Sequence, residues 1–245
     1  MTVEDAVHAG GTQSFSLAVS GAVTPTLAFV PIGPKTYGDA PFTVNATSNS
    51  TAGMTYSVVS GPATMVGSTV ILTGAGTVVL QVSQDAAGSY GAATAMTSFN
   101  VAVATPIMTF APIAAKTYGD GPFAVSATSN SGGVITYSVT SGPATIVGNT
   151  VTIRGAGTVT LQASCAAQGD YAAATQTASF VVAKAQLTLT ANDATRFYGG
   201  VNPLFSGTIT GLKYNDSIPE EFTTTAGVGS APGTYAIVRA SREWA

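Results

Sequence analysis

The chain has few of the residues from which most enzyme sites are built. Its 245 residues include one cysteine, Cys165, and one histidine, His8. A single cysteine excludes a disulfide within the chain and leaves a cysteine-based metal site without a second thiolate. A single histidine leaves a serine or cysteine nucleophile without a credible general base. Cys165 stands where Gln84 stands 81 residues earlier, so we interpret it as an incidental thiol near a strand end.

Charged residues are scarce as well. They make up 8% of the chain, with a net charge of −3, against roughly 25% in an ordinary soluble domain. Eight Lys and Arg spread along the chain provide no basic surface for nucleic acid. Glu220 and Glu221 are adjacent, so on a strand they would point to opposite faces. The remaining candidates for a pair of glycosidase carboxylates could meet only across modules: Asp39, Asp85, Asp120 and Asp170.

Long apolar runs are missing too. Hydrophobic residues make up 45% of the chain, but Ser, Thr, Gly and Pro interrupt them before any window of about 20 residues becomes predominantly apolar. We therefore expect no membrane insertion. The opening residues MTVEDAVHAGGTQ lack a basic segment followed by an apolar one, so no signal peptide is predicted in this chain. The composition predicts no catalytic, cofactor-binding or metal-binding residues and no cofactor.

What the sequence does contain is an internal repeat. KTYGD at residues 35–39 returns at 116–120, GAGTV at 74–78 returns at 155–159, and Tyr90 returns as Tyr171, each 81 residues later. The constant spacing means that no insertion or deletion separates the two copies. A period of this length predicts tandem copies of one structural unit.

Each copy is rich in strand signals. Short runs of Val, Ile, Thr and aromatic residues alternate with Gly, Pro, Asn and Ser, and no stretch shows helical periodicity. In the first copy we expect strands at LAFVPI (27–32), FTVNATS (42–48), MTYSVVS (54–60), ATMVG (63–67), TVILTG (69–74), TVVLQVS (77–83) and SFNVAVA (98–104). Seven short strands in about 80 residues predict an all-β fold of tandem immunoglobulin-like β-sandwiches.

The KTYGD motif is interpreted as a corner used once per module. Gly38 allows a turn that other residues disfavour, and Asp39 can bond nearby backbone amides. Tyr37 and Phe42 bracket the turn and are expected to pack at the edge of the sandwich. A calcium site at Asp39 and Asp120 is the alternative, but no cluster of further carboxylates accompanies them.

A third unit contains the same Tyr-Gly corner, but the rest of its sequence differs from the two repeats. Residues 187–218 read LTLTANDATRFYGGVNPLFSGTITGLKYNDSI, and GTYAIV follows at 233–238. This stretch resembles the bacterial MBG domain of the YGX type, and the two 81-residue copies resemble the bacterial Ig-like repeats that commonly precede it. The resemblance implies a module of large, secreted, multi-domain surface proteins, often adhesin-like.

The predicted organisation has four parts. Residues 1–24 are a remnant closing strand of a preceding module or a disordered tail, because SFSLAV at 14–19 resembles the closing SFNVAV and SFVVAK. Residues 25–105 and 106–185 are Ig-like repeats, and 186–245 are a truncated MBG module. We therefore expect a fragment or a truncated gene product. Its incomplete third module would expose sheet edges.

These patterns favour a non-catalytic spacer of an extracellular or bacterial cell-surface protein, cut from a longer precursor and flanked by neighbouring repeats. The first alternative is a module that binds a glycan or protein through loops 85–94 and 166–175. These loops carry Tyr90 and Tyr171, which either stack on sugars or plug the ends of their sandwiches. The second alternative is an accessory domain of a secreted glycoside-active enzyme.

Overall fold

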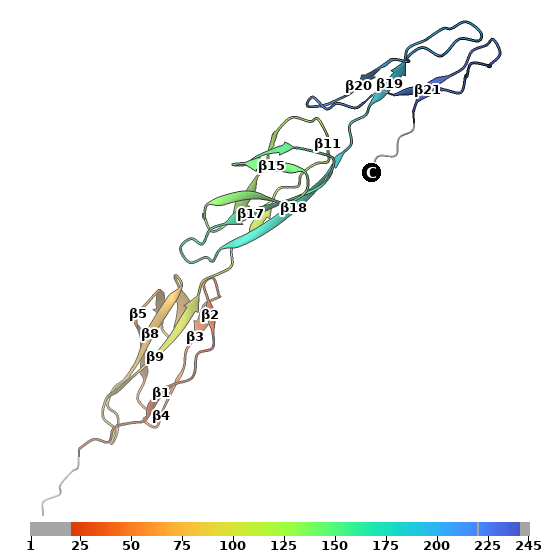
Figure 1. Cartoon of the computed structure of the whole chain (residues 1–245). Helices are drawn as coiled ribbons and strands as arrows, with labels where there is room; N and C mark the ends of the chain where they lie inside the picture. The colour runs from red at the N-terminus through yellow and green to blue at the C-terminus, as the bar shows by residue number, and fades with distance from the viewer. Residues whose placement is uncertain (1–20, 220, 241–245) are drawn as a thin grey trace, which may run out of the picture. The chain divides into compact units, whose positions relative to one another are not determined.

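The computed structural model describes residues 21–219 and 221–240 (Figure 1). Every regular element in this part of the chain is a β-strand, which confirms the predicted all-β class. The chain divides into two compact units, Met1–Ala104 and Thr105–Ala245. His8, Glu220 and the SFSLAV segment lie outside the described residues.

The first unit contains one repeat, built from three sheets in two layers. One sheet has the order β2-β9-β8-β5, formed by Lys35–Thr36, Ala93–Ala102, Gly76–Gln84 and Met54–Ser60. The other layer contains the pair β1-β4, Leu27–Phe29 with Ala46–Ser48, and the sheet β3-β7-β6, Phe42–Thr43, Thr69–Leu72 and Ala63–Val66. This arrangement is the immunoglobulin-like sandwich that the strand count predicted.

The second unit begins with the same repeat. Its four-stranded sheet is β11-β18-β17-β14, and its other layer contains β10-β13 and β12-β16-β15. The strands are Met108–Phe110 (β10), Lys116–Thr117 (β11), Phe123–Ala124 (β12), Ala127–Ser129 (β13), Ile135–Ser141 (β14), Ala144–Val147 (β15), Thr150–Ile153 (β16), Gly157–Cys165 (β17) and Ala174–Ala183 (β18).

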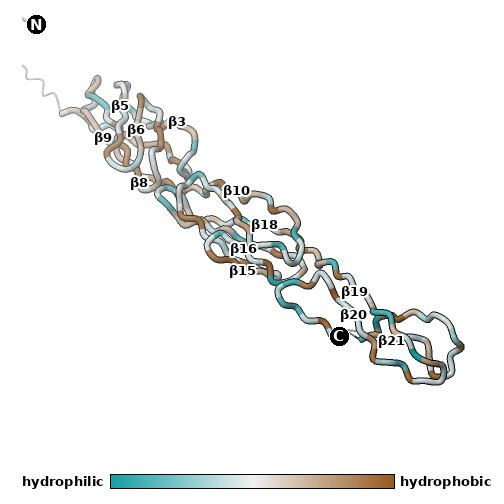
Figure 2. Tube along the Cα trace, turned by 90° about the horizontal axis from the view of Figure 1, so that it is seen from above, coloured by the Kyte–Doolittle hydropathy of each residue, from teal (hydrophilic) through white to brown (hydrophobic). Residues whose placement is uncertain are grey.

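Alternation along the strands builds the core of each repeat. Val78, Leu80 and Val82 on β8 are fully buried, as their spacing of two predicts, and their neighbours on the strand face outward. Along the whole chain, Figure 2 shows short apolar segments interrupted by polar ones. Tyr56 also links the two layers, because its hydroxyl accepts a hydrogen bond from Ala46 N–H at 3.0 Å.

One expected strand is divided in the structure. The run FTVNATS forms two short strands, β3 and β4, that pair with different partners. Between them, Val44 is buried and donates its N–H to Ser68 O at 2.9 Å, while Asn45 O accepts from Val30 N–H. The chain thus changes partner strands at Val44–Asn45.

The KTYGD motif forms a strand as well as a turn. Lys35–Thr36 pairs in parallel with the closing strand β9 and places Lys35 opposite Val101. The predicted turn follows, with Gly38 at a φ of 92°. Asp39 Oδ2 accepts a hydrogen bond from Thr36 N–H at 2.9 Å, as expected of an aspartate that caps a local turn.

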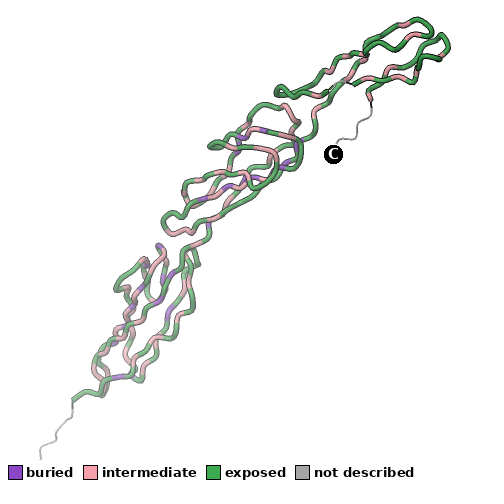
Figure 3. The backbone as a smooth tube through the Cα atoms, viewed as in Figure 1, coloured by how far each residue is buried: buried purple, intermediate pink, exposed green. Residues whose placement is uncertain are grey.

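The third module, also in the second unit, is sparse. It contains the pairs β19-β20, Thr188–Ala191 with Gly207–Thr210, and β21-β22, Phe222–Thr224 with Ile237–Arg239. No described residue from 186 to 240 is buried, whereas both repeats contain buried residues (Figure 3). The described part of this module therefore has no core of its own.

Candidate functional site

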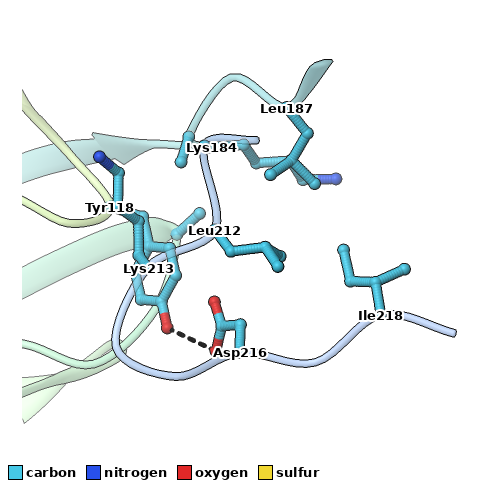
Figure 4. Close-up of a pocket in the computed structure, with 10 residues that line it drawn as sticks. Tyr118, Lys184, Leu187, Leu212, Lys213, Asp216 and Ile218 are labelled. Carbon is cyan, nitrogen blue, oxygen red and sulfur yellow. Dashed lines mark hydrogen bonds between the residues drawn. The ribbon is translucent and has the colours of Figure 1, made fainter. Parts of the chain in front are cut away.

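The most specific constellation joins the second repeat to the third module. The turn after β11 contributes Tyr118, Gly119 and Asp120, and the loop after β20 contributes Tyr214 and Asp216. Figure 4 shows Tyr118 and Asp216 facing each other. These residues are more than 90 apart in sequence, at separations of 98 and 94 for the two hydrogen-bonded pairs. We call this constellation the joint.

Three interactions hold the joint. The Tyr118 hydroxyl donates to Asp216 Oδ1 at 3.2 Å, and the Tyr214 hydroxyl donates to the backbone oxygen of Asp120 at 2.8 Å. The two tyrosine rings meet edge to face, with centroids 5.4 Å apart and planes at 67°. Each tyrosine therefore bonds across the joint and packs against the other.

Left-handed backbone conformations on both sides of the joint shape the two loops that meet there. Gly119 has a φ of 104°, which disfavours other residues, and a Cβ there would lie 2.5 Å from the Lys213 side chain and displace it. On the other side, Tyr214 and Asn215 have φ values of 50° and 67°, and Asp216 N–H bonds to Lys213 O at 2.8 Å. Non-glycine residues rarely adopt this conformation, and each costs about 1–3 kcal/mol when it does.

The joint borders a cavity of about 200 Å³. Its walls combine apolar side chains with two lysines, a carboxylate and the tyrosine, as Figure 4 shows. The lining residues are Tyr118, Ala156, Lys184, Ala185, Leu187, Gly211, Leu212, Lys213, Asp216 and Ile218. No serine, cysteine or histidine is among them, so this cavity contains no Ser–His or Cys–His pair.

Electrostatics favour the neutral form of Tyr118. Partial burial raises the pKa of this phenol above its usual value of 10.0, and the hydrogen bond to Asp216 and the charges of Asp216 and Tyr214 raise it further. The phenol is therefore protonated and able to donate to the carboxylate at neutral pH.

The two tyrosines of the glycan-binding alternative lie in tight turns. Tyr90 is half-buried and exchanges two backbone hydrogen bonds with Ala87, at 3.0 and 3.1 Å. Tyr171 is half-buried and exchanges two with Gln168, both at 3.1 Å. The binding role of these two tyrosines stays a prediction.

The aspartates considered for calcium act within their own turns. Asp120 Oδ2 accepts from Thr117 N–H at 2.9 Å, as Asp39 does in the first repeat. In residues 21–219 and 221–240, no group of three or more His, Cys, Asp or Glu is placed to hold a metal ion. The described residues also include no helix long and apolar enough to cross a membrane.

Cys165 is buried at the end of β17, where the position in the first repeat is Gln84. Its sulfur lies 3.3 Å from Ser131 Oγ, and hydrogen bonds from Ser131 and then Ser129 lower the pKa of the thiol, against the effect of burial. Gln84 instead bonds to Ser48 Oγ at 2.6 Å and donates to two backbone oxygens. Both side chains tie the end of a core strand to the loop before its paired strand, which is β5 for β8 and β14 for β17.

The sequence did not predict the joint. Tyr118 and Asp120 were interpreted as parts of a corner, and the GLKYND stretch was used only for its family resemblance. The available signal was Tyr214-Asn215-Asp216, because Asn and Asp tolerate left-handed φ values in tight turns. The partner across the joint could not be identified from local sequence.

Comparison with known proteins supports the family resemblance of the third module. Residues 187–243 match the family model of the MBG domain (YGX type). No curated protein matches the chain.

Several solved structures are similar at low identity. A SusE-like surface-located polysaccharide-binding protein from the Bacteroides thetaiotaomicron heparin utilisation locus is 12% identical, with a TM-score of 0.26 over 66% of this chain and 34% of that protein. A crystal structure of titin domains is 14% identical, with a TM-score of 0.33 over 89% and 88% of the two chains. Domains 1–6 of the surface layer protein SbsC are 14% identical, with a TM-score of 0.27 over 91% and 41%. This chain therefore spans about a third of the first of these proteins.

Proposed function

We propose that this chain, whose third module is an MBG domain of the YGX type, is a non-catalytic, force-bearing spacer of a bacterial cell-surface protein. In this proposal it is an extracellular part of a longer precursor and transmits tension between neighbouring modules. The low content of charged residues, the tandem repeats and the MBG resemblance support a surface location. The observation that carries the mechanical role is the parallel strand pair found in each repeat.

The parallel pair connects the beginning of a repeat to its end. In the first repeat, Lys35 and Thr36 lie opposite Val101 and Ala102, and Tyr37 N–H donates to Ala102 O at 2.9 Å. The second repeat has the same arrangement, with β11 against β18 (Figure 1). Its Tyr118 N–H donates to Ala183 O at 2.8 Å.

This geometry determines how tension acts on the hydrogen bonds. When the two ends of a repeat are pulled apart, its early strand moves toward the N-terminal attachment and its closing strand toward the C-terminal one. Because the strands are parallel, they slide along each other and all their hydrogen bonds bear the force together. An antiparallel hairpin pulled at its open end would instead lose its bonds one at a time. The parallel pair is therefore expected to raise the unfolding force of a repeat strongly, although it contributes little to the free energy of unfolding.

Single-molecule pulling of the whole chain tests this role. Ala102 lies beyond the last pairing of β9 with β8, at Val101, and still pairs with Thr36 of β2. Ala102→Pro removes a backbone donor from this parallel pair and leaves the β8–β9 ladder intact. Ala102→Ser keeps the N–H at the same exposed position and is the matched control.

We expect two high-force unfolding events in the parent chain and in Ala102→Ser, one for each repeat. Ala102→Pro should leave one. If its two repeats still unfold at unchanged high force, the parallel pair does not carry the load. If the parent repeats unfold at forces no higher than the third module, the proposed spacer function itself is contradicted.

A further inference from the structure

The joint places two phenols in contact, those of Tyr118 and Tyr214. Their ring centroids lie 5.4 Å apart, with an interplanar angle of 67°. A phenol that loses one electron and one proton becomes a phenoxyl radical, whose unpaired electron lies partly on the ring carbons next to the hydroxyl. Two such radicals in contact can form a carbon–carbon bond. A ring pair with one phenylalanine, such as Tyr137 on Phe110, does not offer this reaction.

The two phenols differ in the group that accepts their proton. The Tyr118 hydroxyl donates to Asp216 Oδ1 at 3.2 Å, so a carboxylate is in place to take its proton as the electron leaves (Figure 4). The Tyr214 hydroxyl donates at 2.8 Å to the backbone oxygen of Asp120, which is a much weaker base. Because loss of an electron makes a phenol a far stronger acid, a hydrogen-bonded carboxylate lowers the cost of oxidation. Tyr118 is therefore expected to be the more easily oxidised of the two.

The pair is accessible from solvent. The Tyr214 side chain is 53% exposed, and Tyr118 is half-buried. Residues 211–217 are all exposed and belong to no strand. The edge-to-face contact of the two rings must change before two carbons next to the hydroxyls can meet. Because Tyr214 lies on this exposed loop, its ring can turn without opening a core.

We propose that the joint is an oxidative cross-linking site, at which an external one-electron oxidant, such as a peroxidase that uses hydrogen peroxide, joins Tyr118 and Tyr214 into a dityrosine. Each phenol loses one electron and one proton. The proton of Tyr118 passes to Asp216 and on to solvent, and that of Tyr214 passes to water. The radicals combine through one Cε carbon of each ring, and the hydrogen of each of these carbons moves to the phenol oxygen, which restores both aromatic rings. The two electrons and two protons reduce one hydrogen peroxide to two water molecules.

The cross-link replaces exposed, noncovalent contacts by a covalent bond between the second repeat and the third module. It closes a loop from Tyr118 to Tyr214 and so restricts the unfolded chain, as a disulfide does. A disulfide within the chain is excluded, because Cys165 is its one cysteine. This modification goes beyond the proposed spacer function and does not involve the parallel strand pairs.

Treatment of the full chain with a peroxidase and hydrogen peroxide, at low protein concentration, is the first test. We expect dityrosine fluorescence in a product of monomer mass, and peptide mapping by mass spectrometry should identify the bond between Tyr118 and Tyr214. Tyr118→Phe and Tyr214→Phe keep their rings, and each should abolish this cross-link. Tyr198→Phe is the matched control and should retain it, because Tyr198 is 71% exposed and lies outside the joint. A parent chain whose tyrosines are oxidised without joining Tyr118 to Tyr214 overturns the proposal.

A second variant tests the proton acceptor. Asp216→Asn keeps an oxygen that accepts from the Tyr118 hydroxyl but removes the base, so we expect the cross-link to form several-fold more slowly than in the parent. Asp193→Asn changes an exposed aspartate outside the joint and should react at the parent's rate. Hydrogen exchange at the amide of residue 216, which bonds to Lys213 O, checks that the loop keeps its shape. An unchanged rate in Asp216→Asn contradicts the assigned proton transfer.

Discussion

Two glycines in the second repeat provide a matched test of how its strands are packed. Gly142 lies between β14 and β15 with a φ of 94°, and Gly148 lies between β15 and β16 with a φ of 59°. A Cβ at Gly148 would meet no atom within 4 Å. A Cβ at Gly142 would clash with the carbonyl oxygen of Thr158 and lie 2.7 Å from Val159 Cα.

The two substitutions should therefore differ in cost. Alanine at a left-handed φ costs about 1–2 kcal/mol relative to glycine, so Gly148→Ala should cost this strain alone. Gly142→Ala adds a clash with backbone, which cannot rotate away as a side chain could. This clash can be relieved only if β17 shifts at Val159, which is fully buried. Overpacking of this kind costs about 1–3 kcal/mol more. We expect a total of roughly 2–5 kcal/mol for Gly142→Ala.

Hydrogen exchange of the whole chain measures both costs, because the several modules need not unfold together. The free energy of opening at core amides of β17 and β18 should fall more for Gly142→Ala than for Gly148→Ala, and amides of the first repeat should not change. An equal decrease in the free energy of opening in the two variants would refute the close contact between Gly142 and the backbone of β17. Gly61, which meets Thr77 and Val78 in the same way, offers a second copy of the test in the first repeat.

Three further predictions follow from particular side chains. Gln84→Ala should destabilise the first repeat by about 2–4 kcal/mol, since it leaves buried hydrogen-bonding groups unpaired. An unchanged free energy of opening at the β8 amides, measured by hydrogen exchange, would contradict this prediction. Because the pKa of Tyr118 is raised, its neutral phenol stabilises the joint fully below pH 10.0. This stabilisation is lost as the pH rises through the raised pKa. The tyrosinate absorbance of the parent minus that of Tyr118→Phe should accordingly titrate above 10.0, and a midpoint at or below it would disprove the assigned environment. Tyr90→Ala with Tyr171→Ala should lower the thermal stability of the repeats because both residues are half-buried in turns, whereas loss of binding on a glycan array with unchanged stability would favour the glycan-binding alternative.

Strands with a local signal were predictable from the sequence. MTYSVVS is β5 over the same residues, and the glycine in VGST forms the two-residue hairpin between β6 and β7 at a φ of 59°. Val78, Leu80 and Val82 are buried as their alternation predicted. In these places propensity, alternation and turn chemistry all indicate the same structure, so local sequence was sufficient.

Features that depend on distant partners were not predictable. The two-residue strand Lys35–Thr36 has a weak strand signal and exists because Val101 and Ala102 lie beside it. The division of FTVNATS at Val44 depends on a bond to Ser68. The joint requires Tyr118 and Asp216 to meet across 98 residues. Periodicity reports which face of a strand is buried, but not which strand or loop lies against it.

The direction dependence of unfolding force tests the central claim most directly. In one arrangement, the second repeat is pulled from Thr105, before β10, and Lys184, after β18, so that β11 and β18 slide in shear. In the other, it is pulled from Asn149, at the tip of the β15–β16 hairpin, and Lys184, so that the hairpin peels away first. The account predicts a clearly higher unfolding force in the first arrangement at equal equilibrium stability. An equal or lower force there would contradict a spacer that bears load through its parallel strand pairs.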